Sequence, residues 1–441
     1  MRRSARLAGV LALFVTLLFP SAAVPVLYID INAPGGRRMP VAVASFVVAS
    51  GDPALSRAIP KVLEGDLALT DLFDLVPEKA HMEAVTPAHF SGTPLSFPAW
   101  KVIGAEAVVI GKVDTRGDQV SVEMRLYDAT QGTLMAGKRY TGSPRQVRAI
   151  AHRFANEIVY AFTGVRGIFG TEIAFTARPG PDRGKGKGKE IYLVGMDGQE
   201  LRQVTDNRSF NLFPHWSPDG QWLAYTSYRT GVPVIYLRNV AAGNEKEGVR
   251  FGNTKSPGGF SPDGQWLYAE VSQDGNSDIF RVRVIGGEAE GVVGGGGLEV
   301  SPAPSPDGRM LAFVSDRGGS PQVYVKTLGG ADEVRLSQGS GYATSPSWSP
   351  AGNRIAFTAR AEGKFAVFTV APDGSDLRQV AGAPDGDCED PSFSPDGRYL
   401  VYSYRKRGYS ELKIISTDGR QERTLASGLG DMGSPAWSPG R

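Results

Sequence analysis

The sequence predicts a mainly β protein, in which a six-bladed β-propeller follows a smaller α+β domain. The second half repeats one short motif every 44 or 45 residues, whereas the first half mixes strand and helix patterns without that repeat. A four-stranded propeller blade typically takes about 40–45 residues. We therefore expect an export signal over 1–23, the α+β domain over 24–165 and the propeller over 168–441.

The N-terminal segment has the pattern of a cleaved export signal. Three arginines among the first six residues precede an apolar run at 7–19, and small residues follow it. This order is typical of a secretory signal, and the apolar run is too short to span a bilayer as a helix. We expect cleavage after Ala23 and an exported mature protein.

Residues 24–165 combine strand and helix patterns, as expected of an α+β domain. Apolar and β-branched residues dominate two runs, and two others alternate apolar with polar side chains in the manner of a half-buried hairpin. The expected strands are 40–46, 107–111, 120–127 and 133–141, with a helix within 53–69.

A second helix of this domain is expected after Ser143. Serine is a favoured N-cap residue, and the proline that follows it suits the first helical position. Apolar side chains recur on one face from Val147 to Phe162, and the helix should end near Gly164. Because His152 falls on the other face, we expect it to be an exposed polar residue.

Six copies of a Ser-Pro motif define the second half. Ser-Pro-Asp-Gly favours a type I turn, because proline presets φ at the second position and glycine suits the end. Apolar, β-rich runs flank the motif, so each copy predicts a strand, a tight turn and a second strand. One copy has Ala351 in place of the aspartate, which we expect to loosen its turn. The motif serines are 217, 261, 305, 349, 394 and 438.

The two ends of the repeat region complete one blade. Residues 173–178 match the second strand of the other copies but lack a first strand, whereas 435–439 form a first strand with nothing after it. We predict that these strands pair and close the ring of six blades, which leaves no open strand edge. Trp437 should then be buried.

Composition argues against several classes of function. Without segment 1–23 the chain has 45 lysines and arginines against 46 aspartates and glutamates, so charge gives no case for nucleic-acid binding. Cys388 is the only cysteine and the four histidines are far apart, so we expect no disulfide, no metal site and no cofactor. The acidic run 385–390 is compatible with a solvated loop, part of a partner site or a Ca²⁺ site, although its spacing differs from an EF-hand.

An enzymatic role is not expected. The sequence has no G-x-S-x-G nucleophile elbow and no G-x-x-x-x-G-K-[ST] phosphate loop. Two alternatives to a protein-binding scaffold stay open. The first is the lid propeller of an exported hydrolase, and the second is a propeller that binds a small ligand or glycan in its central funnel.

Several runs of residues match one known family. They lie at 100–111, 125–128, 151–157 and 162–167, and the last continues into 171–175. With the signal, the α+β domain and six blades in this order, the mature chain resembles the TolB family of the Tol-Pal system in Gram-negative envelopes. The resemblance implies a periplasmic, non-enzymatic scaffold that binds the lipoprotein Pal through the propeller and TolA through the N-terminal domain. It would support outer-membrane integrity and invagination during cell division.

The predicted Pal site is one mouth of the propeller channel, where the loops before the innermost strands converge. The resemblance to TolB assigns this mouth to Pal, and solvated loops without function are the alternative. We expect charge reversal at Lys255 and Glu389 to weaken Pal binding without a change in stability. The residues five to seven positions before each motif serine are Phe210, Asn211, Thr254, Lys255, Glu299, Tyr342, Thr344, Asp387, Glu389, Asp431 and Met432.

The predicted TolA site is the N-terminus that signal cleavage creates. Residues 26–32 alternate apolar and polar side chains, a strand pattern, and a Pro-Gly-Gly sequence then separates them from the next strand. A short tethered strand can add to the open sheet edge of a partner. The resemblance favours TolA as that partner, and an edge strand of its own domain is the alternative. The residues concerned are Leu27, Tyr28, Ile29, Asp30, Ile31 and Asn32.

Overall fold

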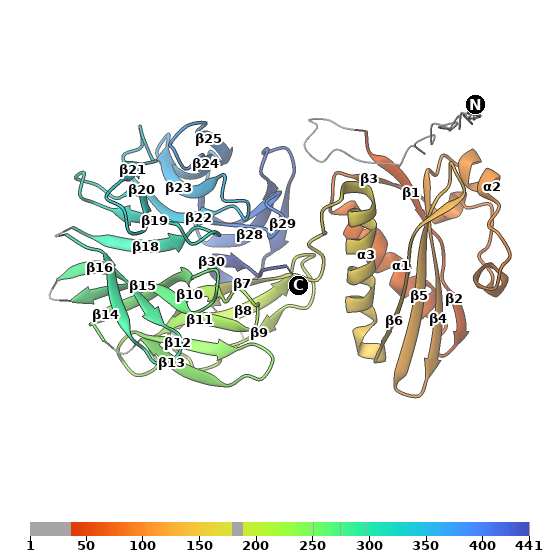
Figure 1. The fold of residues 1–441 in the computed structure, drawn as a ribbon, viewed down its shortest axis with the longest axis horizontal. Coiled ribbons are helices and arrows are strands. Elements are labelled where there is room, and N and C mark those ends of the chain that lie inside the picture. Colours follow the sequence, from red (N-terminus) through yellow and green to blue (C-terminus); the bar gives the residue numbers. More distant parts are fainter. Residues whose placement is uncertain (1–36, 179–187, 250, 274, 296, 441) are drawn as a thin grey trace, which may run out of the picture.

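The structure, a computed structural model, describes residues 37–178, 188–249, 251–273, 275–295 and 297–440. The predicted signal at 1–23 and the predicted strand at 26–32 lie outside these residues. Figure 1 shows two units side by side, an α+β unit and a six-bladed β-propeller, so the predicted fold class is confirmed. No helix among the described residues is both long enough and apolar enough to cross a membrane.

Within residues 37–178, the N-terminal unit has a six-stranded sheet with helices on both sides. Its strand order is β3-β1-β4-β5-β6, and β2 also pairs with β4; β1 runs parallel to β3 and β4, and the remaining long strands are antiparallel. The strands are β1 (Met39–Val43), β2 (Val47–Ser50), β3 (Phe73–Val76), β4 (Ala107–Arg116), β5 (Gln119–Asp128) and β6 (Thr133–Gly142). The α-helices are α1 (Leu55–Ala68), α2 (Phe97–Val102) and α3 (Val147–Thr163), and the 3-10 helices are η1 (Glu78–Ala80), η2 (Pro87–Phe90) and η3 (Pro144–Gln146).

Helix α3 follows directly on the 3-10 helix η3, and the two together begin and end where the sequence predicts one helix. Ser143 and Gln146 form a capping box, in which the Ser143 N–H donates to Gln146 Oε1 at 2.9 Å. At the other end Gly164 adopts φ 70°, a left-handed conformation that glycine takes without steric cost, and its N–H donates to Tyr160 O. The helix therefore has defined ends and holds its apolar face against the sheet.

The propeller consists of six four-stranded antiparallel sheets. Blade 1 contains β10 (Asn211–Trp216), β11 (Trp222–Ser227), β12 (Val234–Asn239) and β13 (Glu245–Val249), and blade 2 contains β14 (Thr254–Phe260), β15 (Trp266–Gln273), β16 (Asn276–Arg283) and β17 (Ala289–Val293). Blade 3 contains β18 (Glu299–Pro304), β19 (Met310–Ser315), β20 (Gln322–Thr327) and β21 (Glu333–Arg335), and blade 4 contains β22 (Ala343–Trp348), β23 (Ile355–Ala361), β24 (Lys364–Val370) and β25 (Arg378–Ala381). Blade 5 contains β26 (Asp387–Phe393), β27 (Tyr399–Lys406), β28 (Tyr409–Ser416) and β29 (Glu422–Ala426), and blade 6 contains β30 (Gly430–Trp437), β7 (Glu172–Arg178), β8 (Glu190–Gly195) and β9 (Arg202–Gln203).

The ring closes as predicted from the two ends of the repeat region. Strand β30 pairs with β7, with Trp437 opposite Ile173, so blade 6 joins the C-terminal strand to the first strands of the propeller. Trp437 is buried, and its indole N–H donates to Thr171 Oγ1 at 2.9 Å. A buried side chain and a satisfied indole N–H hold the last strand in place.

The motif turns have one hydrogen-bond pattern, and the Ala351 copy keeps it. Gly220 N–H donates to Ser217 O at 2.9 Å, and Gly352 N–H donates to Ser349 O at the same distance. The expected loosening is therefore not seen in the bond that closes the turn. Without an aspartate, the Ser349 hydroxyl donates instead to Asn353 Oδ1 at 2.9 Å.

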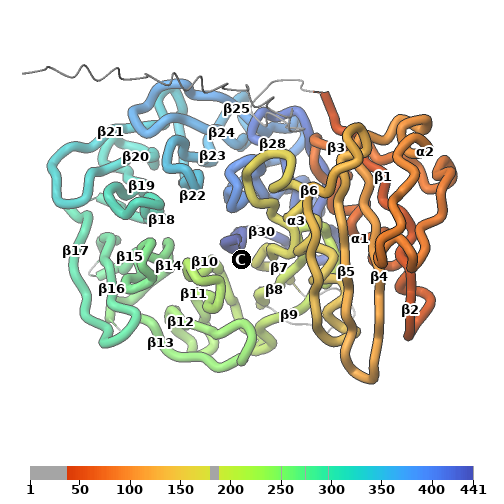
Figure 2. Tube along the Cα trace, turned by 45° about the vertical axis from the view of Figure 1, so that its right-hand side comes forward, coloured from red at the N-terminus to blue at the C-terminus, as the bar shows by residue number. Residues whose placement is uncertain are grey.

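The α+β unit and the propeller share one apolar cluster. Helix α3 lies on the propeller side of the sheet, next to blade 6 (Figures 1 and 2), and Phe162 belongs to the same buried cluster as Ile173 and Tyr399 of the propeller. The linker is fixed to α3, because the Asn156 side chain accepts a hydrogen bond from Phe169 N–H and donates one to Phe169 O.

The expectation that His152 is exposed is wrong. Its residue exposure is only 7%, and Nδ1 lies 2.7 Å from Asp66 Oδ2. The helical pattern correctly placed it away from the sheet-facing residues, but that second face packs against α1 and the propeller. The periodicity of apolar residues in one helix does not reveal that its polar face is covered by another unit of the same chain.

Candidate functional site at the propeller mouth

The innermost strands of the six blades surround a central channel. Strands β10, β14, β18, β22, β26 and β30 contact one another in turn, and residues from all six line a cavity of about 570 Å³. Because every blade has the same strand order, all six inner strands begin at the same end of this channel. We call that end the mouth and the end that carries the Ser-Pro turns the turn end.

Each inner strand has a bulge where its proline faces the channel. The register to the second strand shifts at that point in every blade. In five blades the residue before the proline has φ between 48° and 56°, a region that non-glycine residues rarely occupy. These five residues are Phe213, Ser301, Ser345, Asp390 and Ser434.

Acidic groups and a neutral imidazole face the channel. Glu270 Oε2 accepts a hydrogen bond from Ser301 N–H at 3.0 Å, and burial raises the pKa of Glu270. Burial lowers the pKa of His215 to about 4, so this imidazole is uncharged at neutral pH. Asp390 accepts hydrogen bonds from Ser345 Oγ and from Ser434 N–H, which connects blade 5 to blades 4 and 6. Among the described residues that line the cavity, none is a lysine or arginine.

The eleven predicted Pal-binding residues lie at or next to the starts of the inner strands, but they differ in exposure. Exposed residues of this set are Phe210, Thr254 and Tyr342. Half-buried residues are Thr344, Asp387, Glu389 and Asp431. Buried residues are Asn211, Lys255, Glu299 and Met432. Only the first two groups present side-chain surface to a partner.

The buried members of the set support the mouth from below. Asn211 Nδ2 donates to Glu190 Oε2 at 2.8 Å, and Glu299 Oε1 lies 3.0 Å from Arg317 Nη2. Lys255 Nζ donates to the Gly252 carbonyl at 2.8 Å and to a second backbone carbonyl, and burial lowers its pKa. The premise that Lys255 is a surface charge that can be reversed at no cost in stability is therefore wrong, because its ammonium group holds the preceding loop.

Basic residues that the sequence prediction missed surround Asp431. Lys189 Nζ lies 2.9 Å and Arg178 Nε 3.5 Å from its Oδ2, and Arg405 lies 3.9 Å from Glu389. Burial raises the pKa of Asp431, but the hydrogen bond and charge of Lys189 outweigh it, so the net pKa is lowered. A sequence signal for two of them was present, because arginine is the last residue of the second strand at 178 and the last but one at 405.

The acidic run 385–390 belongs mainly to β26 rather than to a loop. Asp387 Oδ1 accepts a hydrogen bond from Phe365 N–H at 3.0 Å, and Asp385 pairs with Lys406 and accepts from the Tyr404 hydroxyl. Cys388 is buried, and burial, with a contribution from Glu422, raises the pKa of its thiol to about 12. A reactive thiolate is thus disfavoured, and burial contributes more to this than the neighbouring carboxylates.

Exposed aromatic side chains give the mouth a surface suited to protein contacts. Phe210 is 40% exposed and lies edge-on to Tyr228, while Tyr342 is 37% exposed and lies edge-on to Phe365 at 5.6 Å. Aromatic residues with a polar surround are typical of the energetically dominant part of protein interfaces. The mouth therefore has the composition of a docking surface, with charged groups beside its aromatic residues.

Comparison with known families supports both units of the chain. A family model described as the TolB beta propeller domain matches residues 159–441, and one described as the TolB amino-terminal domain matches residues 27–135. The chain belongs to the TolB family. The resemblance read from the sequence is thereby confirmed.

Individual TolB proteins agree with this assignment. The chain is 34% identical over 240 residues to the Tol-Pal system protein TolB of Desulfosudis oleivorans, which is 53% of each chain. It is 35% identical over 231 residues to that of Syntrophus aciditrophicus, which is 51% of this chain and 50% of the relative. These matches span about half the length of each relative. The crystal structure of TolB from Acinetobacter baumannii superposes with a TM-score of 0.78 at 26% identity, over 94% of this chain and 100% of that one.

Proposed function

We propose that this protein is a non-enzymatic scaffold of a Tol-Pal system and that it works in the periplasm. In this proposal the propeller mouth binds the lipoprotein Pal, and the N-terminal segment 27–32 binds TolA. Its role is to support outer-membrane integrity and the inward movement of the outer membrane at division. Family membership supports the assignment to the system, and the mouth supports the choice of the Pal surface.

The observation that carries the Pal proposal is the position of the mouth relative to the α+β unit. That unit contacts blade 6 at the β8–β9 turn, where Arg148 pairs with Asp197. The β8–β9 turn follows the third strand of its blade, so it lies at the turn end. Phe210 and Tyr342 are at the opposite end, and both are exposed in the part of the chain that the structure describes.

Affinity capture tests the proposal and separates it from the two alternatives. The tagged mature protein, incubated with detergent extract of the envelope, should retain a Pal-type lipoprotein and a membrane-anchored TolA-type protein, identified by mass spectrometry. Retention of neither, together with a rise in melting temperature on addition of oligosaccharides, would favour the ligand-binding propeller. Hydrolysis of peptide or ester substrates by the purified protein would favour the hydrolase.

A deletion tests the TolA site independently of Pal. Removal of residues 24–33 should abolish TolA binding while Pal is still captured and the melting temperature falls only slightly. A matched variant changes only the apolar members of the strand pattern, Leu27, Ile29 and Ile31, to Asn and should have the same effect. TolA binding by both variants would place the site on the folded α+β unit.

A further inference from the structure

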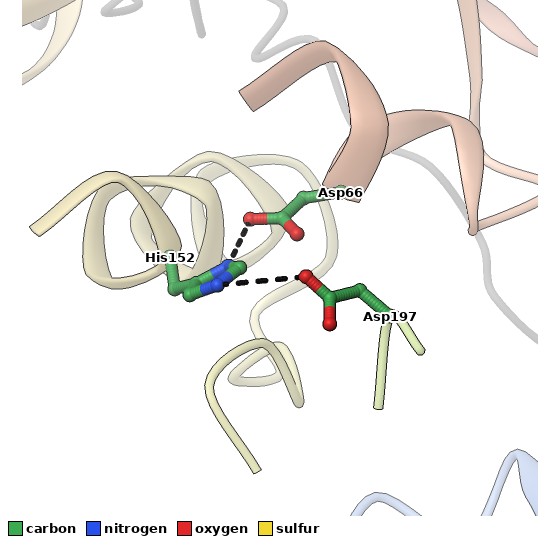
Figure 3. Close-up of side chains that lie close together, drawn as sticks. All are labelled: Asp66, His152 and Asp197. Atoms are coloured by element: carbon green, nitrogen blue, oxygen red, sulfur yellow. Dashed lines mark hydrogen bonds and ion pairs between the residues drawn. The ribbon is translucent and has the colours of Figure 1, made fainter. Parts of the chain in front are cut away.

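A buried histidine lies between two carboxylates where the α+β unit meets the propeller. His152 belongs to α3, Asp66 to α1 and Asp197 to the β8–β9 turn of blade 6, so the three side chains come from both units (Figure 3). Residue exposure is 1% for Asp66 and 7% for His152, and the Asp197 side chain is 13% exposed. The neighbouring linker is close as well, since a Cβ on Gly170 would lie 3.5 Å from His152 Cβ.

The two carboxylates approach opposite nitrogens of the imidazole. His152 Nδ1 lies 2.7 Å from Asp66 Oδ2, within the α+β unit, and Nε2 lies 3.8 Å from Asp197 Oδ2, across the joint (Figure 3). In this arrangement each ring nitrogen faces its own carboxylate. It is the arrangement of a proton donor that faces two acceptors.

The number of protons on His152 decides which contacts the ring can make. A neutral imidazole carries one N–H, and the other nitrogen presents a lone pair. If Nδ1–H donates to Asp66, the lone pair of Nε2 faces the Asp197 carboxylate and repels it. The imidazolium ion carries an N–H on both nitrogens and a positive charge, so it attracts both carboxylates at once.

We propose that His152 is a proton-dependent latch between the two units, which tightens the joint when the ring is protonated and loosens it when the ring is neutral. Histidine is the side chain whose charge ordinarily changes between about pH 5 and 8. Protonation of the ring closes the latch, and loss of that proton opens it.

The other charged groups at the joint set the limits of this effect. Arg148, one turn before His152 on α3, pairs with Asp197, and its Nε lies 3.9 Å from Glu200 Oε1 in the same propeller turn. Because arginine keeps its charge, these pairs persist at alkaline pH and the joint loosens without coming apart. Burial raises the pKa of Asp66, and the hydrogen bond and charge of His152 and the charge of Arg148 oppose this rise without cancelling it.

Hydrogen exchange at the linker measures the latch without any partner. The Phe169 N–H donates to Asn156 Oδ1 on α3 at 2.9 Å, so its protection reports how firmly the linker is held to that helix. After correction for intrinsic exchange, protection in the full chain should fall about tenfold between about pH 6 and pH 8.5, the size expected for loss of one hydrogen bond to a charged group.

Three variants test whether His152 and Asp197 cause the pH dependence of this protection. His152→Gln keeps a donor toward Asp66 without a titrating proton, and it should remove the pH dependence. Asp197→Asn should lower protection at both pH values and also remove most of the dependence. His89→Gln changes a buried histidine of the α+β unit that is close to Glu83, outside this cluster, and it should behave as the wild type.

The proposal is overturned by either of two results. One is equal protection of the wild-type linker at both pH values. The other is an unchanged pH dependence in His152→Gln or, if that variant does not fold, in Asp197→Asn, whose substitution lies in a propeller turn outside the core of the α+β unit.

Discussion

The two ends of the propeller differ although the same strands connect them. At the turn end the motif hydroxyl donates to an aspartate in four blades and to Asn353 in a fifth, and the glycine closes the same turn each time. At the mouth the equivalent positions carry different residues from blade to blade, such as Phe210, Thr254 and Tyr342. The turn end therefore has the same stabilising hydrogen bonds in each of these blades. The mouth has a different set of side chains in each blade, so its surface differs around the ring.

This difference separates changes that affect stability from changes that affect recognition. Substitutions in the motif turns and at the closing strand should alter the free energy of unfolding. Substitutions of exposed mouth residues should alter partner binding with little effect on unfolding. Substitutions of the buried mouth residues should also alter the free energy of unfolding, although these residues lie at the mouth.

The largest expected effect is at the strand that closes the ring. Trp437→Ala removes a buried indole and its bond to Thr171, which should cost about 3–5 kcal/mol and lower the melting temperature by roughly 10 °C. Trp348→Ala is the matched change at the same position of blade 4, where the indole donates to Ala303 O. Thermal unfolding followed by circular dichroism should give losses of similar size. A much smaller loss for Trp437→Ala would mean that the C-terminal strand does not close the ring.

The second prediction tests whether the buried mouth residues contribute to stability. Lys255→Glu places a carboxylate beside the backbone carbonyls that now accept from the ammonium group, so stability should fall by roughly 3 kcal/mol. Lys255→Met, which removes the charge but keeps an unbranched chain, should cost less. Both are measured by urea unfolding. Unfolding of Lys255→Glu at the same urea concentration as the wild type would show that Lys255 does not stabilise the fold. Its substitution would then be expected to affect partner binding only.

Smaller changes are expected at the turn end. Ser217→Ala removes a hydroxyl that accepts from Trp222 N–H at 2.9 Å, and it should cost about 1 kcal/mol. Ala351→Asp supplies the aspartate acceptor of the other copies in place of Asn353 and should add about 0.5 kcal/mol. Neither variant should change Pal binding, as measured by calorimetric titration. A change in Pal affinity without a change in stability would contradict the separation of the two ends.

Another small effect depends on pH and lies in the channel between the two ends. Burial raises the pKa of Glu270, which means that the folded state disfavours its charged form. The charged carboxylate therefore weakens folding above its raised pKa, and the penalty disappears as the pH falls through that value. Glu270→Gln should raise stability at about pH 8, by no more than roughly 1 kcal/mol, and less at about pH 5. A larger gain at the acidic pH would contradict this assignment.

The sequence predicts those features that depend on neighbouring residues or on the repeat. The turn at Ser217 and the cap at Ser143 are encoded within four residues, and the regular interval between motif serines is enough to predict six blades and their closure through Trp437. The repeat also places the starts of the inner strands. It does not say that Lys255 points inward, because the side chain is buried by its own loop.

The joint between the units could not be predicted in the same way. Asp66, His152 and Asp197 come from three segments that share no periodicity, and they meet only when the α+β unit packs against the propeller. A helical pattern identifies the face of α3 that packs on the sheet. It does not identify a partner for the other face, which is why His152 was expected to be exposed.

The affinity of purified Pal for the mouth tests the proposed function most directly. Phe210→Ala combined with Tyr342→Ala removes two exposed aromatic side chains at the mouth, and Ile285→Ala removes an exposed apolar side chain that follows the third strand of blade 2, at the turn end. Calorimetric titration should show Pal binding weakened at least about tenfold in the double variant and unchanged in the Ile285 control, with all proteins equally stable. Wild-type affinity in the double variant would contradict the assignment of Pal to the mouth.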